Sequence, residues 1–281
     1  MKRWVIALVI ASLLGGCTAL RLAYRQADTL LSWRANHYFD LEPQQKHEFD
    51  VRLQRLLAWH RQEQLPDYAA FMSSAVDRMW PGLKPEHVTW AIDGARERYK
   101  VLVERGAADA AELLGTLSPE QITNLQKQWA KDNRKFVREH ELEGTLAERR
   151  RARLKRTIEQ IEDWTGNLSS DQEQKIAQLL EPIPLIDHLR YKDRLRRQQE
   201  FVDLLKIRAN RQEFQPRLRA WLLDWDRGRT PEYDRLWREV YERRVNFYVA
   251  VDKLLTPSQR QHVAERIKRF VEDFRSLSAK T

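Results

Sequence analysis

The sequence predicts an all-α protein, an elongated bundle of about eight amphipathic helices. Apolar residues recur at helical spacing in nearly every segment, and no window shows the sustained alternation that a half-buried strand requires. Glycine and proline number only 9 and 10 in 281 residues, too few for the frequent turns of a β-sandwich. Ten tryptophans supply apolar volume for a core, although 32% of the residues are charged.

Apolar stripes place the expected helices along the chain. The stripes cover 20–31, 49–57, 88–102, 122–136, 154–164, 201–205, 233–254 and 263–277. Glycine and proline separate them, and the Pro182 to Pro184 stretch is the most plausible internal boundary. It divides the chain into a helical half at 41–181 and a second half at 182–281, with one continuous bundle as the alternative.

The first residues, "MKRWVIALVIASLLGGC", have the organisation of an export signal. Lys2 and Arg3 precede an apolar stretch of about eleven residues, too short to span a bilayer. The following Leu14-Gly15-Gly16-Cys17 resembles the bacterial lipobox. That resemblance implies a signal peptide at 1–16 and acyl chains on Cys17, which anchor the lipidated segment and first helix at 17–40 to a membrane.

The residue after the cysteine bears on location. Cys17 is the only cysteine, so the chain has no internal disulfide, and lipidation accounts for the lone sulfur. Lipoproteins retained at the inner membrane commonly carry Asp after the cysteine, whereas this chain carries Thr18. The resemblance therefore implies the periplasmic face of the outer membrane, in preference to the inner membrane.

A short phrase recurs at residues 41, 83, 117, 168 and 255 and predicts helix starts. In "LSPEQ" at 117, Ser118 suits the N-cap, Pro119 the first helical position, and Gln121 can reach back to complete a capping box. Thr256, Pro257 and Gln259 repeat these roles in "LTPSQ". The irregular spacing of the copies excludes a solenoid of fixed period.

The same phrase is similar to the LTxxQ signature of Spy-like periplasmic proteins, which are all-α chaperones and envelope-stress modulators. The similarity covers residues 117–121 and 255–259. Over roughly residues 17–275, the order of "YFDLEPQQK", "LLAWHRQEQLPDYA", "LSPEQITNLQ" and "LTPSQRQHV" resembles a family of uncharacterised Gram-negative lipoproteins. That resemblance implies a lipoprotein and brings no catalytic residues.

The chain is basic, with a formal net charge of +9, or +7 (9 − 2) after loss of Lys2 and Arg3. The run "RRRARLKR" concentrates the positive charge in about two helical turns. It is either a solvated helix face or a patch that contacts lipid phosphates. We expect no nucleic-acid partner, because no aromatic residues interleave the run. The candidate anion-binding residues are Arg149, Arg150, Arg151, Arg153, Lys155 and Arg156.

Two aromatic groups allow alternative roles. Trp59, His60 and Tyr68 lie around an expected helix end near Pro66, as core packing or as the rim of a pocket. A second group either packs in the core or an interhelical turn, or contacts a peptide or glycan. It comprises Trp221, Trp225 and Tyr233, beside Arg227 and Arg229.

No catalytic motif is recognisable. The seven histidines are scattered, HExxH and nucleotide-binding glycine motifs are missing, and we expect no catalytic residue, metal site or cofactor. The sequence therefore favours a non-catalytic binding or chaperone-like module whose partners are the membrane, through Cys17, and unfolded or acidic envelope proteins or anionic lipid. The alternative is an envelope scaffold that contacts lipopolysaccharide, peptidoglycan or a partner lipoprotein.

Overall fold

A computed structural model describes residues 15–80 and 82–279, with side chains from Leu20 onward. Helices make up 84% of the structure, and its described part contains no strand, which confirms the all-α prediction. The helices are α2 (Gly15–Arg25), α3 (Ala27–Phe39), α4 (Pro43–Trp59), α5 (Leu65–Met79), α6 (Pro85–Gly115), α7 (Pro119–Glu139), α8 (Leu146–Thr165), α9 (Ser170–Leu180), α10 (Asp187–Lys206), α11 (Arg211–Leu223), α12 (Pro231–Leu254) and α13 (Pro257–Ser278).

The prediction of about eight helices was too low for this part of the chain. The first stripe breaks at Gln26, between α2 and α3. Three further helices had no predicted stripe: α5 begins beside Pro66, α9 has only 11 residues, and α11 contains Pro216 in its interior. A short helix provides few turns in which an apolar period can repeat, and an interior proline suggests a break.

The helix end expected near Pro66 was also wrong. A π-helical turn, η1 (His60–Gln64), joins α4 directly to α5. The N–H of Leu65 bonds to the carbonyl of His60, five residues back. Proline has no N–H to give to the carbonyl four residues before it, so an α-helix meets a defect at this position. The wider turn lets the helix continue past Pro66.

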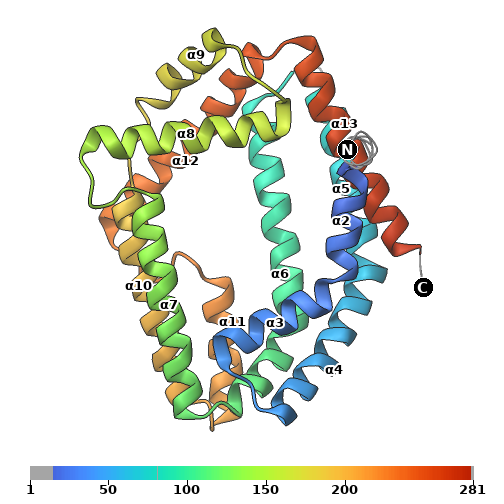
Figure 1. Ribbon diagram of the computed structural model, residues 1–281, viewed down its shortest axis with the longest axis vertical. Helices are drawn as coiled ribbons and strands as arrows, with labels where there is room; N and C mark the ends of the chain where they lie inside the picture. The colour runs from blue at the N-terminus through green and yellow to red at the C-terminus, as the bar shows by residue number, and fades with distance from the viewer. Residues whose placement is uncertain (1–14, 81, 280–281) are drawn as a thin grey trace, which may run out of the picture.

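The helices form a frame around a central opening in the ribbon (Figure 1). In that view α6 borders one side of the opening, α7 and α10 the other, and α8 lies above it. On the outer side α13 packs against α5 and α2, and at the lower edge of the opening α11 packs against α6 (Figure 1). Segments from before and after Pro182 are thus in direct contact at several places.

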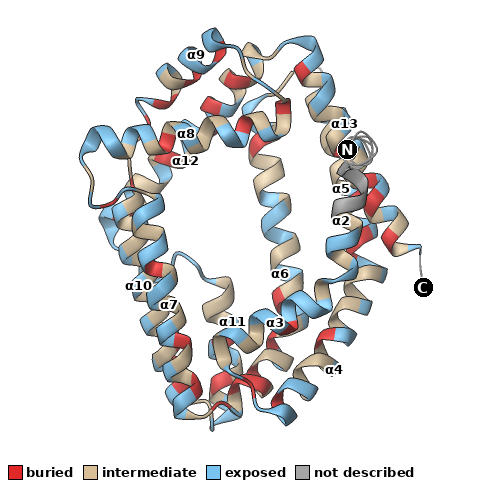
Figure 2. Cartoon of the chain, viewed as in Figure 1, coloured by how far each residue is buried: buried red, intermediate tan, exposed pale blue. Residues whose placement is uncertain are grey.

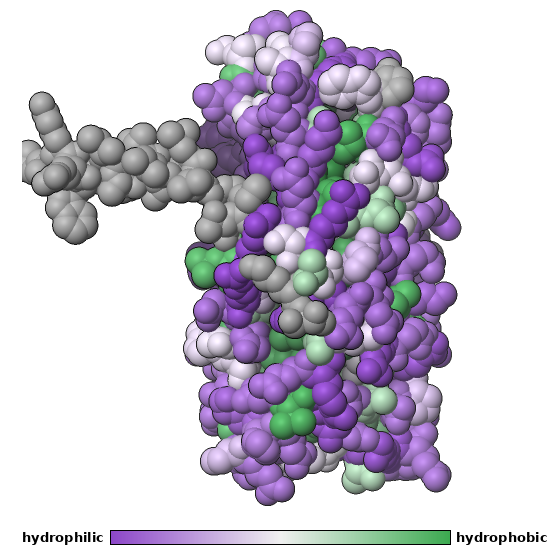
Figure 3. All heavy atoms as spheres, turned by 90° about the vertical axis from the view of Figure 1, so that its right-hand side faces the viewer, coloured by the Kyte–Doolittle hydropathy of each residue, from purple (hydrophilic) through white to green (hydrophobic). Residues whose placement is uncertain are grey.

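Two apolar clusters stabilise the frame. One contains Leu117, Leu205 and Phe214 from the region of α6, α7, α10 and α11, and the other contains Ile176 and Phe247 from α9 and α12. Buried residues concentrate where helices meet, while outward surfaces are largely exposed (Figure 2). The outer face near α5 and α13 is mainly hydrophilic, with hydrophobic residues visible in narrow strips between helices (Figure 3).

The recurring phrase does more than start helices, because its glutamines bind one another in pairs. Gln45, at the start of α4, donates its amide to Gln121 Oε1 at 3.2 Å, and Gln121, at the start of α7, donates to Gln45 Oε1 at 2.6 Å. Each amide also donates across to the loop before the other helix, at Thr116 O and Asp40 O, both at 2.9 Å. We call this arrangement the first junction.

The second junction repeats the pattern with Gln172 of α9 and Gln259 of α13. Their amides exchange hydrogen bonds of 2.8 and 3.1 Å. Across the junction, Gln172 donates to Leu254 O at 2.8 Å and Gln259 to Asn167 O at 2.9 Å. In both junctions two buried glutamines tie together the N-terminal ends of two helices that are distant in sequence.

The capping boxes provide the rest of each glutamine's hydrogen bonds. Ser118 accepts from the N–H of Gln121 at 3.3 Å and donates its own N–H to Gln121 Oε1 at 2.8 Å. Thr256 and Gln259 make the same two bonds, at 3.2 and 2.9 Å. The copy at 83 has His87 where the others have glutamine. It forms no junction in the described structure, and instead Leu83 N donates to Asp252 at 3.0 Å.

The predicted signal peptide falls on residues 1–14 and on the first residues of α2, and the side chain of Cys17 lies outside the described residues. Beyond it, Arg21 of α2 binds Asp273 of α13 at 2.5 Å, and Asp273 is almost fully buried. This ion pair fixes the helix that carries Cys17 onto the frame. Within the described range, none of the helices is both long and apolar enough to cross a membrane.

Candidate binding cavities

A cavity of about 590 Å³ lies between α3, α4, α6, α7, α10 and α11. We call it the aromatic cavity. Trp129 and Phe201 meet edge to face with centroids 5.8 Å apart, and Phe201 packs on Trp221 at 4.8 Å. The volume is within the usual range for ligand sites, roughly 300–1,000 Å³. Its aromatic lining residues are Tyr38, Phe39, Phe49, Trp129, Phe201 and Trp221.

Charged side chains of both signs border the aromatic cavity. Arg52 binds Asp109 at 3.0 Å, and Tyr38 donates its hydroxyl to Asp132 at 2.5 Å. Burial raises the pKa of Tyr38, and the bond to Asp132 raises it further, so the phenol keeps its proton. Arg34 and Arg194 also line the cavity and form no ion pair among the described residues, although Arg194 donates its Nε–H to Asn133 Oδ1 at 2.7 Å.

Two glycines lie inside α6, and close packing explains only one of them. A Cβ at Gly94 would lie 2.3 Å from the ring of Phe71, so close packing requires glycine there. A Cβ at Gly106, which lines the aromatic cavity, would meet only Leu56, at 3.9 Å. Glycine in a helix interior costs about 1 kcal/mol relative to alanine. Packing against neighbouring side chains therefore does not account for the glycine at position 106, which lies on the wall of the aromatic cavity.

A second cavity, of about 350 Å³, lies between α6, α8, α10 and α12. Four arginines from these four helices line it, and we call it the arginine pocket: Arg96, Arg153, Arg190 and Arg244. Asp187 is the one carboxylate among the lining residues, and it binds Arg190 at 3.1 Å. The aromatic cavity and the arginine pocket share α6 and α10 as walls.

The sequence profile of a family of unknown function, DUF6279, matches residues 37–235, more than half of the chain. The chain belongs to the DUF6279 family. The matched residues include the first junction and Gly106, whereas α13 lies beyond the match. No curated protein and no solved structure matches the DUF6279 chain.

In this DUF6279 protein the basic run of α8 does not form a single patch. Arg153 is buried and donates to Leu180 O at 3.0 Å and Ile183 O at 2.6 Å, and Arg156 donates to Glu139 O. Arg150 and Lys155 are exposed and pair at 3.9 Å with Glu181 and Glu159. Arg149 is half-buried and Arg151 exposed. Only Arg153 of the six lines the arginine pocket.

The two aromatic groups singled out in the sequence have separate locations. His60 accepts or donates a hydrogen bond with Tyr24 at 2.9 Å and packs against Tyr68, beneath α2 and α13. Trp221 lines the aromatic cavity, with the guanidinium of Arg197 4.3 Å from its ring. In the described part of the DUF6279 chain, no group of three or more His, Cys, Asp and Glu residues is placed to hold a metal.

Sequence reasoning singled out Arg153 and Trp221 but missed most of the other residues that line the two cavities. Arg96, Arg190 and Arg244 are spread over about 150 residues, and each is a common residue on a charged helix. Gly106 offered a local signal, since a glycine inside a strongly periodic helix requires a packing or functional reason.

Proposed function

We propose that this DUF6279 protein is a non-catalytic, lipid-anchored binding protein that holds apolar segments of unfolded envelope proteins in its aromatic cavity. The observation that carries the proposal is the aromatic cavity itself, bordered by charge and with Gly106 on its wall. Aromatic walls with a few charged groups at the margin are typical of sites that bury an apolar ligand part and leave its polar part in water.

The charges at the margin favour a polypeptide that carries acidic residues beside its apolar ones. Asp109 and Asp132 are already bound to Arg52 and Tyr38, which leaves Arg34 and Arg194 to meet an anionic group of the client. Rim charges add selectivity and association rate more than affinity. Binding should therefore weaken as salt rises, while the apolar contribution remains.

The proposed anchor is a set of acyl chains on Cys17, at the periplasmic face of the outer membrane. The lipobox-like sequence supports it, and so does the apolar surface just beyond: Leu22, Leu30 and Trp33 are all more than half exposed on α2 and α3. Cells grown with labelled palmitate should label the wild-type chain and leave Cys17→Ser unlabelled. Absence of label from the wild type would remove the anchor from the proposal.

The binding test uses a soluble form, residues 18–281, and a reduced client protein that aggregates when diluted from denaturant. We expect stoichiometric soluble protein to suppress light scattering by the client. Gly106→Phe fills the aromatic cavity and should abolish the suppression. Gly106→Ala is the matched control, because it makes the same backbone change with only a methyl group and leaves most of the volume. Equal activity of the two variants would overturn the role of the cavity.

A second candidate function is an envelope scaffold. Arg151 is exposed on α8, and Arg150 and Lys155 make only long ion pairs there, so these three cations face solvent. Replacing all three by Gln should reduce retention of the protein on lipopolysaccharide or peptidoglycan in a pull-down. Unchanged retention would contradict the scaffold function and would leave the proposal for the aromatic cavity intact.

A further inference from the structure

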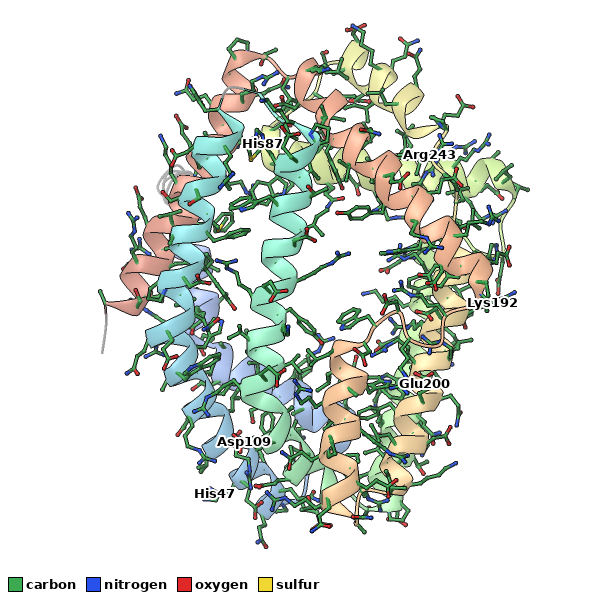
Figure 4. All side chains as sticks on the ribbon, turned by 180° about the vertical axis from the view of Figure 1, so that it is seen from behind. His47, His87, Asp109, Lys192, Glu200 and Arg243 are labelled. Atoms are coloured by element: carbon green, nitrogen blue, oxygen red, sulfur yellow. The ribbon has the colours of Figure 1, made fainter. Side chains whose placement is uncertain are left out.

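The arginine pocket brings four positive charges together inside the frame with only one carboxylate among them. Its four arginines come from α6, α8, α10 and α12 (Figure 4 shows these helices from behind). The single carboxylate of the lining, Asp187, binds Arg190 and lies 4.0 Å from His140. The remaining three guanidinium groups therefore share no carboxylate within the pocket.

Arg153 is the most unusual of the four. Its side chain is 8% exposed, and in the described structure no carboxylate lies within ion-pairing distance of it. Carbonyl oxygens of Leu180 and Ile183 fix its position, at 3.0 and 2.6 Å. Burial lowers the pKa of this arginine, the charge of Asp187 partly offsets that effect, and the nearby Arg244 lowers the pKa further. Arg153 has no carboxylate in direct contact, and Asp187 is already bound to Arg190, so an anion bound in the pocket would offset a cost of burial already present in the fold.

Arg244 and Arg96 are free to contact such an anion. Arg244 is exposed and makes no ion pair with any described residue. Arg96 pairs only with Asp93 of its own helix, at 3.2 Å, and both side chains are at least 60% exposed. Exposed pairs of this kind contribute little, about 0–1 kcal/mol, and yield easily to a stronger partner. Guanidinium groups bind phosphate through paired N–H donors.

The rest of the pocket is apolar. Val88 and Ile92 of α6 face Trp237, Val240 and Val245 of α12 across the cavity. Val88, Val240 and Val245 are buried, whereas Ile92, Trp237 and Tyr248 keep accessible surface. A small inorganic anion would leave that surface in water, whereas an amphiphile would cover it and present its charge to the arginines. We propose that the arginine pocket binds the phosphate group of a phosphate-bearing amphiphile, with its apolar part against α6 and α12. This site is distinct from the aromatic cavity, and the two binding proposals are tested independently.

The test measures binding to the soluble mature chain, residues 18–281, by isothermal titration calorimetry. The probes are monomeric dihexanoyl phosphatidylglycerol, dihexanoylglycerol, which has the same acyl chains without phosphate, and inorganic phosphate. Arg244→Gln should weaken binding of the phospholipid at least about tenfold, the effect of losing one charge-assisted contact. Arg96→Gln is a second variant with the same expectation.

Arg243→Gln is the matched control. Arg243 is the adjacent residue, lies on another face of α12, and binds Glu239 at 3.0 Å (Figure 4). Arg243→Gln makes the same change of net charge as Arg244→Gln and should alter the affinity for the phospholipid less than about twofold. Cavity-filling Gly106→Phe should leave phospholipid binding unchanged, which separates this site from the proposed function.

The outcomes distinguish the source of the phosphate. Phospholipid binding far tighter than that of inorganic phosphate identifies a lipid ligand. Comparable affinity for both, with the same loss in Arg244→Gln, identifies a soluble phosphate compound. The inference is overturned if dihexanoylglycerol binds as well as the phospholipid, if Arg243→Gln and Arg244→Gln lose affinity equally, or if neither phosphate probe binds.

Discussion

Replacing Gln121 by alanine tests whether the junctions hold the frame together. Gln121 is 5% exposed, and its amide makes four hydrogen bonds beyond its own backbone: two with Gln45, one to Asp40 O and one from Ser118 N. Gln121→Ala removes all four. Gln45 retains bonds to Thr116 and from Glu42 N, whereas Asp40 O and Ser118 N lose the partner that Gln121 provides.

The expected loss follows from these two main-chain groups. A buried donor or acceptor left without a partner costs about 1–3 kcal/mol. Both hydrogen bonds are partly buried, so we expect Gln121→Ala to lower the free energy of unfolding by about 3 kcal/mol. That is a large share of the 5–15 kcal/mol that is typical of a folded protein.

Urea unfolding of residues 18–281, followed by circular dichroism and tryptophan fluorescence, measures the change. With an m-value of about 3 kcal/mol/M, the midpoint should fall by about 1 M. Gln126→Ala is the control: Gln126 is an exposed glutamine of the same helix, and its replacement should change the free energy of unfolding by less than about 0.5 kcal/mol. The double variant with Gln45→Ala should show a coupling energy of about 1–2 kcal/mol.

Two results would refute the reasoning. One is a Gln121→Ala midpoint equal to that of Gln126→Ala, since the buried amide would then contribute no more than a surface one. The other is strict additivity of Gln45→Ala and Gln121→Ala, since the two amides would then act independently.

Three further variants test contacts elsewhere in the fold. Arg21→Met leaves Asp273 buried without its cation and should cost about 3 kcal/mol at pH 7. Burial raises the pKa of Asp273 above 3.8, so the stability that this carboxyl contributes is present below that pH and is lost as pH rises through the folded pKa. The loss of unfolding free energy in Arg21→Met, measured by urea unfolding, should therefore be smaller near pH 4 than at pH 7. An equal loss at both pH values would contradict this. Gly94→Ala should lower the melting temperature through the clash with Phe71, and an unchanged value would show that the ring moves freely. Burial lowers the pKa of His60 below 6.5, so stability should fall as pH drops through the folded pKa, and His60→Gln should flatten that decline in a pH series of melting temperatures.

Local signals accounted for much of the fold. The all-α class followed from periodicity, and the starts of α7 and α13 followed from Ser118 and Thr256 with the proline after each, because an N-cap depends only on a few adjacent residues. The continuation of the helix through Pro66 was missed, because an interior proline more often ends a helix than is accommodated by a π-helical turn.

The hydrogen-bonded pairing of the recurring segments was not predictable from their residues. Each glutamine has a sufficient local role in its capping box, and nothing nearby indicates that the copy at 41 meets the copy at 117. The arginine pocket was missed for the same reason. Arg153 stood out within a dense basic run, but the fold directs it inward and recruits Arg96, Arg190 and Arg244 from other helices.

The two junctions bear on the order of folding. They join glutamines separated by 76 and 87 residues along the chain. Loop-closure entropy grows only with the logarithm of length, so these two closures differ by roughly 0.1 kcal/mol. Chain length therefore gives neither closure a kinetic advantage. A chain that emerges N-terminus first, however, presents α4 and the start of α7 before residue 259, so the first junction can close before the second.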